Sequence, residues 1–150
     1  MKWEDYKREF VDDGQLRDLY VNNASPNDWQ SMLNFLRSTQ ASMHFYIDGR
    51  AANLPTRISP MLADKSHQYH LSVQMGGVNI DCHFDSAEQI QLTFDPHDIK
   101  NEFNASLIFR LMQSIGRTLD KPVFCAPLHA EDKPIFQYRP GETVEYLESH

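Results

Sequence analysis

Two histidines and an aspartate are the side chains whose types and spacing best suit metal or acid–base chemistry. His70 and His83 lie on either side of a Gly-Gly pair in the segment YHLSVQM-GG-VNIDCHF. Two glycines between alternating runs predict a tight antiparallel hairpin, whose register places His70 opposite His83. Asp81 then falls diagonal to His70 on the same face. Two imidazoles and a carboxylate have the composition of a metal site, but the same residues without further ligands are also typical of a solvated sheet face.

Other residues that could take part in chemistry are explained better by structural roles, in the core or in turns. Cys125 and His129 are four residues apart, yet Cys125 lies in an apolar run with nothing to lower its pKa, so we expect it, like Cys82, to be a core residue. The segment FDPHDI (94–99) is typical of a turn from a strand into a helix. Glycine-loop, serine-elbow and HExxH motifs do not occur. We therefore expect no cofactor.

Acidic and aromatic residues give an argument for binding a protein. A surface of this composition suits a basic protein partner, because aromatic side chains anchor and charges steer the encounter. The alternative for the two tyrosines is that they complete the core of the sheet. The candidate residues are Asp81, Asp85, Glu88, Glu142, Glu145, Glu148, Tyr138 and Tyr146.

The charge of the chain is negative and unevenly distributed. The 150 residues carry a formal net charge of −7. Residues 1–75 contain 8 basic and 9 acidic side chains, whereas residues 76–150 contain 6 and 12. This disfavours nucleic acid and anionic membranes as partners, and it also serves solubility. The apolar runs are too short to span a bilayer and the amino terminus is charged, which predicts a cytoplasmic protein.

Periodicity predicts the elements that must position these residues. Alternating patterns predict strands at 10–11, 16–21, 43–47, 69–75, 78–84, 89–94, 123–126, 135–138 and 143–147. Ser25 as the cap and Pro26 as the first helical residue predict one helix, and helical spacing predicts a second one whose apolar face runs from Leu107 to Leu119. The hairpin has a matching apolar face. We therefore predict a single α+β domain of two layers, an antiparallel sheet with two amphipathic helices on one face.

Five segments resemble a family of small, uncharacterised bacterial proteins. They are DDGQLRDLYV (12–21), NDWQSMLNFL (27–36), GGVNIDCHF (76–84), IQLTFDPHDI (90–99) and GRTLDKPV (116–123). The resemblance covers most of the chain and carries no catalytic residues. Small acidic α+β proteins of this kind are similar in character to the immunity proteins of bacterial toxin systems.

Three functions follow as hypotheses. The first is a non-enzymatic, cytoplasmic binding protein of the immunity type that neutralises a basic toxin domain. The second is a small metal-binding protein or enzyme that uses His70, His83 and Asp81. The third is a homodimer or other homo-oligomer formed through an exposed sheet edge.

Overall fold

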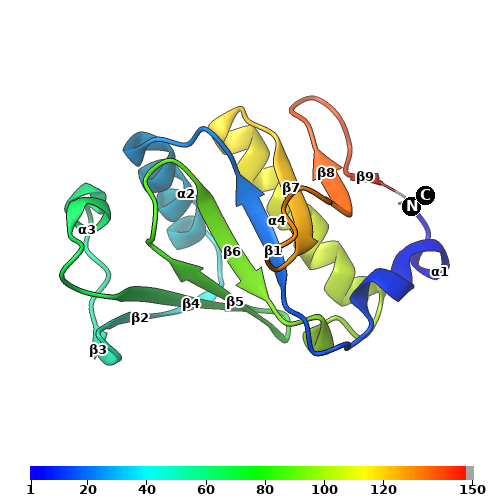
Figure 1. Ribbon diagram of the computed structural model, residues 1–150, viewed down its shortest axis with the longest axis horizontal. Coiled ribbons are helices and arrows are strands. Elements are labelled where there is room, and N and C mark those ends of the chain that lie inside the picture. Colours follow the sequence, from blue (N-terminus) through cyan, green and yellow to red (C-terminus); the bar gives the residue numbers. More distant parts are fainter. Residues whose placement is uncertain (148–150) are drawn as a thin grey trace.

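The computed structural model describes residues 1–147 and has an α+β fold. Nine antiparallel strands form one sheet, in the order β3-β2-β4-β5-β6-β1-β7-β8-β9. Two long helices, α2 and α4, lie on one face of the sheet, behind the strands in Figure 1. The α+β prediction is therefore confirmed.

Every strand pairs antiparallel with its neighbours. Strand β1 lies between β6 and β7, which are both distant from it in the sequence. The two edge strands have only three and two residues, so little backbone is open to pairing with a second copy. The strands are β1 (Arg17–Val21), β2 (Ser42–Ile47), β3 (Arg50–Ala52), β4 (Tyr69–Met75), β5 (Val78–His83), β6 (Ile90–Phe94), β7 (Val123–Pro127), β8 (Phe136–Tyr138) and β9 (Glu145–Tyr146).

The register predicted for the glycine hairpin is confirmed. His70 pairs with His83, and Ser72 pairs with Asp81. Gly76 and Gly77 both have positive φ, of 55° and 82°, which the tight turn requires. A Cβ on Gly76 would lie 2.4 Å from Leu107 Cδ1, so the turn also packs directly on α4.

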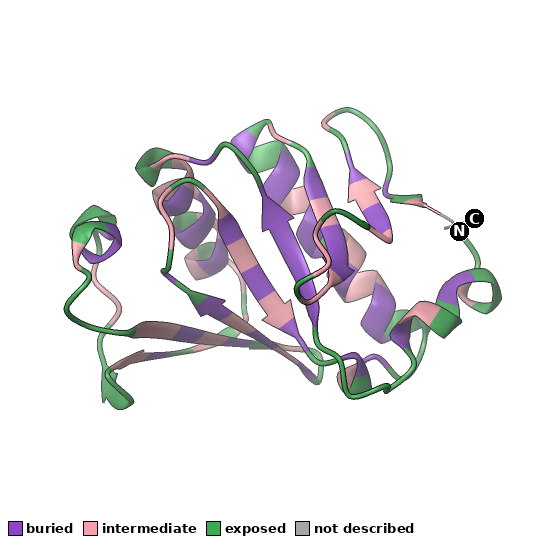
Figure 2. Ribbon diagram, viewed as in Figure 1, coloured by how far each residue is buried: buried purple, intermediate pink, exposed green. Residues whose placement is uncertain are grey.

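Both long helices begin with local capping signals. Helix α2 (Pro26–Ser38) has a capping box, in which Ser25 and Asp28 bond each other's backbone N–H groups. Helix α4 (Glu102–Leu119) begins after Asn101, whose side chain accepts from the N–H of Asn104. Their buried stripes cover the apolar side of the sheet. Figure 2 shows the result: β1 is buried along its length, whereas β6 alternates.

The strand predicted at residues 10–11 is wrong. Residues 3–10 form a short helix, α1 (Trp3–Tyr6), followed by a 3₁₀ turn, η1 (Lys7–Phe10). Tyr6 and Phe10 are buried at helical spacing against Phe136 of β8. The conformation of this segment is determined by aromatic packing, which an alternating pattern of only two residues cannot predict. Strand β3 was not predicted because its residues are exposed on both faces.

Two further short helices complete the described chain: α3 (Ser59–Ala63) and η2 (Pro96–Asp98). Element η2 confirms that FDPHDI is a turn, because Asp95 accepts from the N–H of His97 and caps it. Within residues 1–147, none of the helices has the length and apolar character that a membrane span requires.

Candidate functional site

The face of the sheet that α2 and α4 leave uncovered is called the open face here. It is turned toward the viewer in Figure 1. Its side chains come from alternate positions along each strand. Many of them are polar, whereas the residues between them in the sequence point into the core. One row across it runs from β2 to β1 and contains His44, Ser72, Asp81, Thr93 and Asp18. This row brings together residues far apart in the sequence.

Three rings stack on the open face. Tyr46, His70 and His83 are neighbours on β2, β4 and β5, with centroid distances of 5.6 and 4.8 Å and interplanar angles of 25° and 9°. His70 Nε2 lies 2.7 Å from Asp81 Oδ1. The second oxygen of Asp81 accepts from the amide of Asn79. These contacts hold the ring stack and the carboxylate in one conformation.

The predicted metal ligands do not converge on one point. His70 and His83 stack face to face, and the Nε2 atom of His70 is taken by Asp81. Within residues 1–147, no group of three His, Cys, Asp or Glu side chains is placed to hold a metal ion. His67 lies elsewhere: its Nδ1 is 2.6 Å from Asp48 Oδ2, and this hydrogen bond raises the pKa of His67. In the described residues, this face therefore does not have the arrangement that the metal-site alternative requires.

Asp18 is a fully buried carboxylate on the open face. It accepts hydrogen bonds from Gln91 Nε2 and Thr93 Oγ1, both at 2.7 Å. Burial raises the pKa of Asp18, although these two hydrogen bonds act in the opposite direction. A buried charge whose partners are neutral is costly. The ionised form of Asp18 is therefore energetically costly at this position in the sheet.

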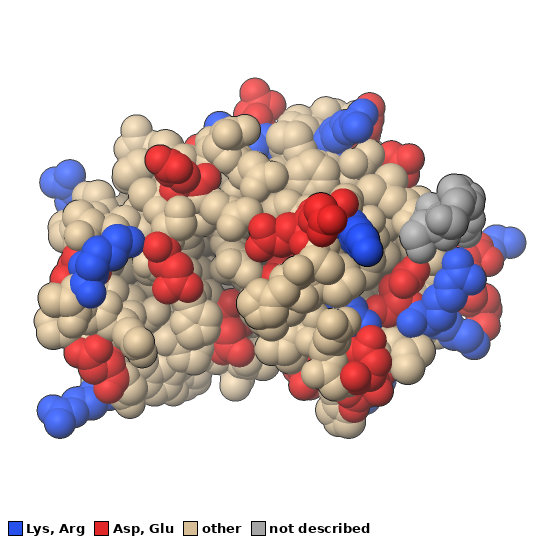
Figure 3. All heavy atoms as spheres, in the orientation of Figure 1, with Lys and Arg blue, Asp and Glu red and all other residues tan. Residues whose placement is uncertain are grey.

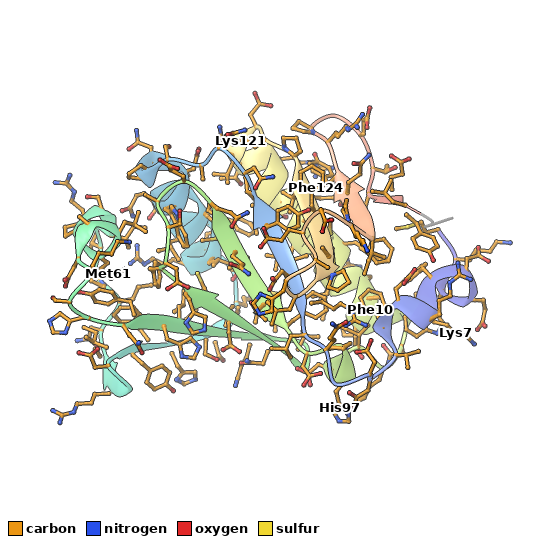
Figure 4. The ribbon with its side chains drawn as sticks, viewed as in Figure 1. Lys7, Phe10, Met61, His97, Lys121 and Phe124 are labelled. Carbon is orange, nitrogen blue, oxygen red and sulfur yellow. The ribbon has the colours of Figure 1, made fainter. Side chains whose placement is uncertain are left out.

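The loop between β7 and β8, residues 128–135, packs on this part of the face. The hydroxyl of Tyr20 donates to the carbonyl of Glu131 at 2.5 Å, and burial raises the pKa of Tyr20 to about 12. Phe124 of β7, labelled in Figure 4, stacks on Tyr20 at 5.3 Å. Gln89 donates to the Glu131 carboxylate at 3.3 Å. The loop is therefore joined to the start of β6.

The structure divides the predicted partner-binding acids into two groups. Asp81 is half-buried, while Asp85 and Glu88 are exposed in the β5–β6 turn. Through Gln89 this turn lies beside Glu131 of the β7–β8 loop. We call Asp81, Asp85, Glu88, Glu131 and the exposed Asp132 the acidic patch. Figure 3 shows acidic side chains outnumbering basic ones across the middle of the viewed face.

The second group lies on the carboxyl-terminal hairpin. Glu142 and Glu145 are exposed, and Glu145 accepts from Gln137 at 3.0 Å. Strand β9 is four strands away from β6, which corresponds to roughly 19 Å at the usual strand spacing. Glu148 lies outside the described residues. The two groups are therefore separate features of the surface.

The expectation that Tyr138 faces a partner is wrong. Tyr138 has no exposed surface, and its ring lies against Gly116 of α4. Tyr146 is partly buried, and its hydroxyl donates to Glu9 Oε2 at 2.6 Å. Both residues serve the internal packing of this end of the sheet. The pattern of the short hairpin could not reveal which of its faces meets the helix.

Both cysteines are core residues, as predicted. Cys82 and Cys125 are free and fully buried, on strands separated by β6 and β1. Burial raises the pKa of both thiols, that of Cys125 to about 12. Thiols in this state are poor nucleophiles.

The sequence analysis missed Asp18 and Tyr46. The signal for Asp18 was present: it is an acidic residue inside the apolar strand pattern Leu16–Val21. The position of Tyr46 beside His70 depends on the pairing of β2 with β4, which no local sequence signal predicts. A comparison with protein families, with curated proteins and with solved structures finds no match for this chain.

Proposed function

We propose that this chain is a non-enzymatic protein-binding factor that receives a basic protein domain on the acidic patch. The observation that carries the proposal is the approach of the β5–β6 turn and the β7–β8 loop through Gln89 and Glu131. It joins acids that are more than 40 residues apart into one patch. Lys65 and Lys133 lie at its margins, Lys65 donating to the carbonyl of Asp85.

Two further features support a binding role. Asp81 is held by His70 and Asn79, and Glu131 is held by Gln89. Side chains already fixed before binding lose less conformational entropy when a partner arrives. The surplus of negative charge in residues 76–150 raises the rate at which a basic partner approaches. The immunity-type role in the cytoplasm is our proposal for this interaction, and it agrees with the character of the sequence.

A deca-lysine peptide tests the patch directly. Titrated into ¹⁵N-labelled protein at low ionic strength, it should shift amide resonances of residues 81–89 and 129–133. Raising the ionic strength to about 0.3 M should weaken the binding, because exposed charges are screened. The variant Asp85→Asn/Glu88→Gln should bind more weakly. Its matched control is Glu4→Gln/Asp5→Asn, which removes two acids from α1.

Shifts spread evenly over the surface, or equal effects of the two variants, would contradict the proposed patch. The immunity role has its own test. Co-expression with a toxin domain encoded by the neighbouring gene should restore bacterial growth, and the Asp85→Asn/Glu88→Gln variant should restore less of it. Growth that is never restored would contradict that role while leaving the peptide result intact.

A further inference from the structure

A second candidate site lies at the end of the sheet where β2 begins and β4 turns into β5. It is a groove of about 500 Å³ between the carboxyl end of α2 and one side of α4. This volume is in the usual range for small-molecule sites. The groove shares no residue with the acidic patch. The lining residues that matter for the argument are Met75, Gly76, Leu107, Arg110, Leu111 and Ser114.

The spacing on α4 explains why the groove has an apolar wall. Leu107, Leu111 and Ser114 follow one another at intervals of four and three residues, so they share one side of the helix. This side lies next to the stripe that packs on the sheet. Phe103 begins the same row one turn earlier and is 58% exposed, which is unusual for so large an apolar side chain in this protein.

The hairpin turn forms the adjoining wall. Asn104 donates to the carbonyl of Gly76 at 3.1 Å and fixes the turn against α4. Gly76 has no side chain, so Leu107 can lie over it. Met75 adds a partly buried apolar surface beside it. Glycine at position 76 therefore both makes the turn and shapes the groove.

Arg110 is the one charged residue in the lining. It is exposed, and its guanidinium forms no hydrogen bond or ion pair with any residue in 1–147. The protein has a net charge of −7, yet the only charge in the lining of this apolar groove is positive. A guanidinium in this position matches a carboxylate, which it can bind through two parallel hydrogen bonds.

We propose that this groove binds a small amphipathic carboxylate, with its aliphatic part on Leu107, Leu111 and Met75 and its carboxylate on Arg110. The lining also contains Gln40 and Gln74, whose amides can form further hydrogen bonds to the head group. This site is independent of the proposed protein-binding function, because the two surfaces have no residue in common.

Sodium decanoate is the probe for this site. Below its critical micelle concentration it should shift amide resonances of residues 39–42, 74–76 and 103–114 in the ¹⁵N-labelled full chain. Decanol, which has the same chain without the charge, should bind about fivefold more weakly, the upper range for an exposed ion pair. Arg110→Gln should remove this difference between decanoate and decanol. Arg117→Gln, an exposed arginine of the same helix outside the groove, should leave it unchanged.

Three results would overturn the proposal. The first is the absence of shifts in these segments up to the critical micelle concentration. The second is an equal affinity for decanoate and decanol, or an equal loss in the two arginine variants. The third is a response to an acidic amphipathic peptide without any response to decanoate, which would identify the groove as a protein-binding surface.

Discussion

The packing of Tyr138 on Gly116 gives a prediction that can be worked out from distances. An ideal Cβ on Gly116 would lie 2.4 Å from both Cδ2 and Cε2 of Tyr138, well inside the 3.0 Å that real Cβ contacts respect. Glycine to alanine inside a helix normally stabilises by about 1 kcal/mol. Overpacking in a core costs about 1–3 kcal/mol, more where the neighbour cannot move.

Gly116→Ala should therefore lower the free energy of unfolding by about 1–2 kcal/mol in spite of the better helix former. For a chain of this length, that corresponds to a fall in Tm of roughly 2–8 °C. The ring cannot swing away, because Tyr138 is fully buried on β8. Urea unfolding followed by circular dichroism gives the free energy directly.

The control is the same substitution in a Tyr138→Leu background. Without the ring, alanine at position 116 should stabilise by about 1 kcal/mol, as helix propensity alone requires. The sign of the effect should thus reverse between the two backgrounds, with a coupling of about 2–3 kcal/mol. If Gly116→Ala stabilises the unmodified chain, Tyr138 is not packed on α4 and the core assignment is wrong.

Three other predictions concern titration and reactivity. Asp48→Asn should lower the pKa of His67 toward its ordinary value in an NMR titration. Because Asp48 raises this pKa in the folded protein, the pair stabilises the fold fully below the unfolded-state pKa of His67. That stabilisation is lost as the pH rises through the folded-state pKa. Burial raises the pKa of Asp18, so the protein should become less stable as the pH rises from the unfolded-state pKa of this residue through its folded-state pKa. Asp18→Asn should remove that part of the pH dependence of stability, measured by chemical denaturation. The same pH dependence in the variant and the unmodified protein would contradict this prediction. Cys82 and Cys125 should resist a thiol reagent at pH 8 until the chain unfolds, and rapid labelling of the native protein would refute their burial.

Local signals in the sequence were sufficient for the parts of the fold that depend on neighbouring residues. The Gly-Gly turn determines its own register, and the Ser25-Pro26 start determines where α2 begins. Strand β3 gave no signal, because its three residues are exposed and pair only with β2. The strand expected at residues 10–11 was wrong because the aromatic partner that buries Phe10, Phe136 of β8, lies more than 100 residues away.

In the candidate site, too, the features set by neighbouring residues could be predicted and those set by long-range packing could not. His70, His83 and Asp81 share a face, as their register predicts. Whether such a group binds a metal depends on the orientation of each ring, and the stacking of the histidines is a tertiary outcome. Tyr138 shows the same limit: alternation over three residues marks two faces but does not say which one a helix covers. The neighbours that bury Asp18, on β6 and β7, are long-range as well.

The position of β1 has a consequence for how the molecule folds. This strand joins β6 to β7, and its partners follow it by about 70 and 105 residues. Closing loops of that length is slow, because chain entropy must be lost before the contacts form. Strands β2 to β6 form one series of mostly neighbouring pairs and β7 to β9 another, so the two series can form early as separate intermediates. Each would expose an unpaired inner edge until β1 inserts, which makes this interval the stage most open to aggregation.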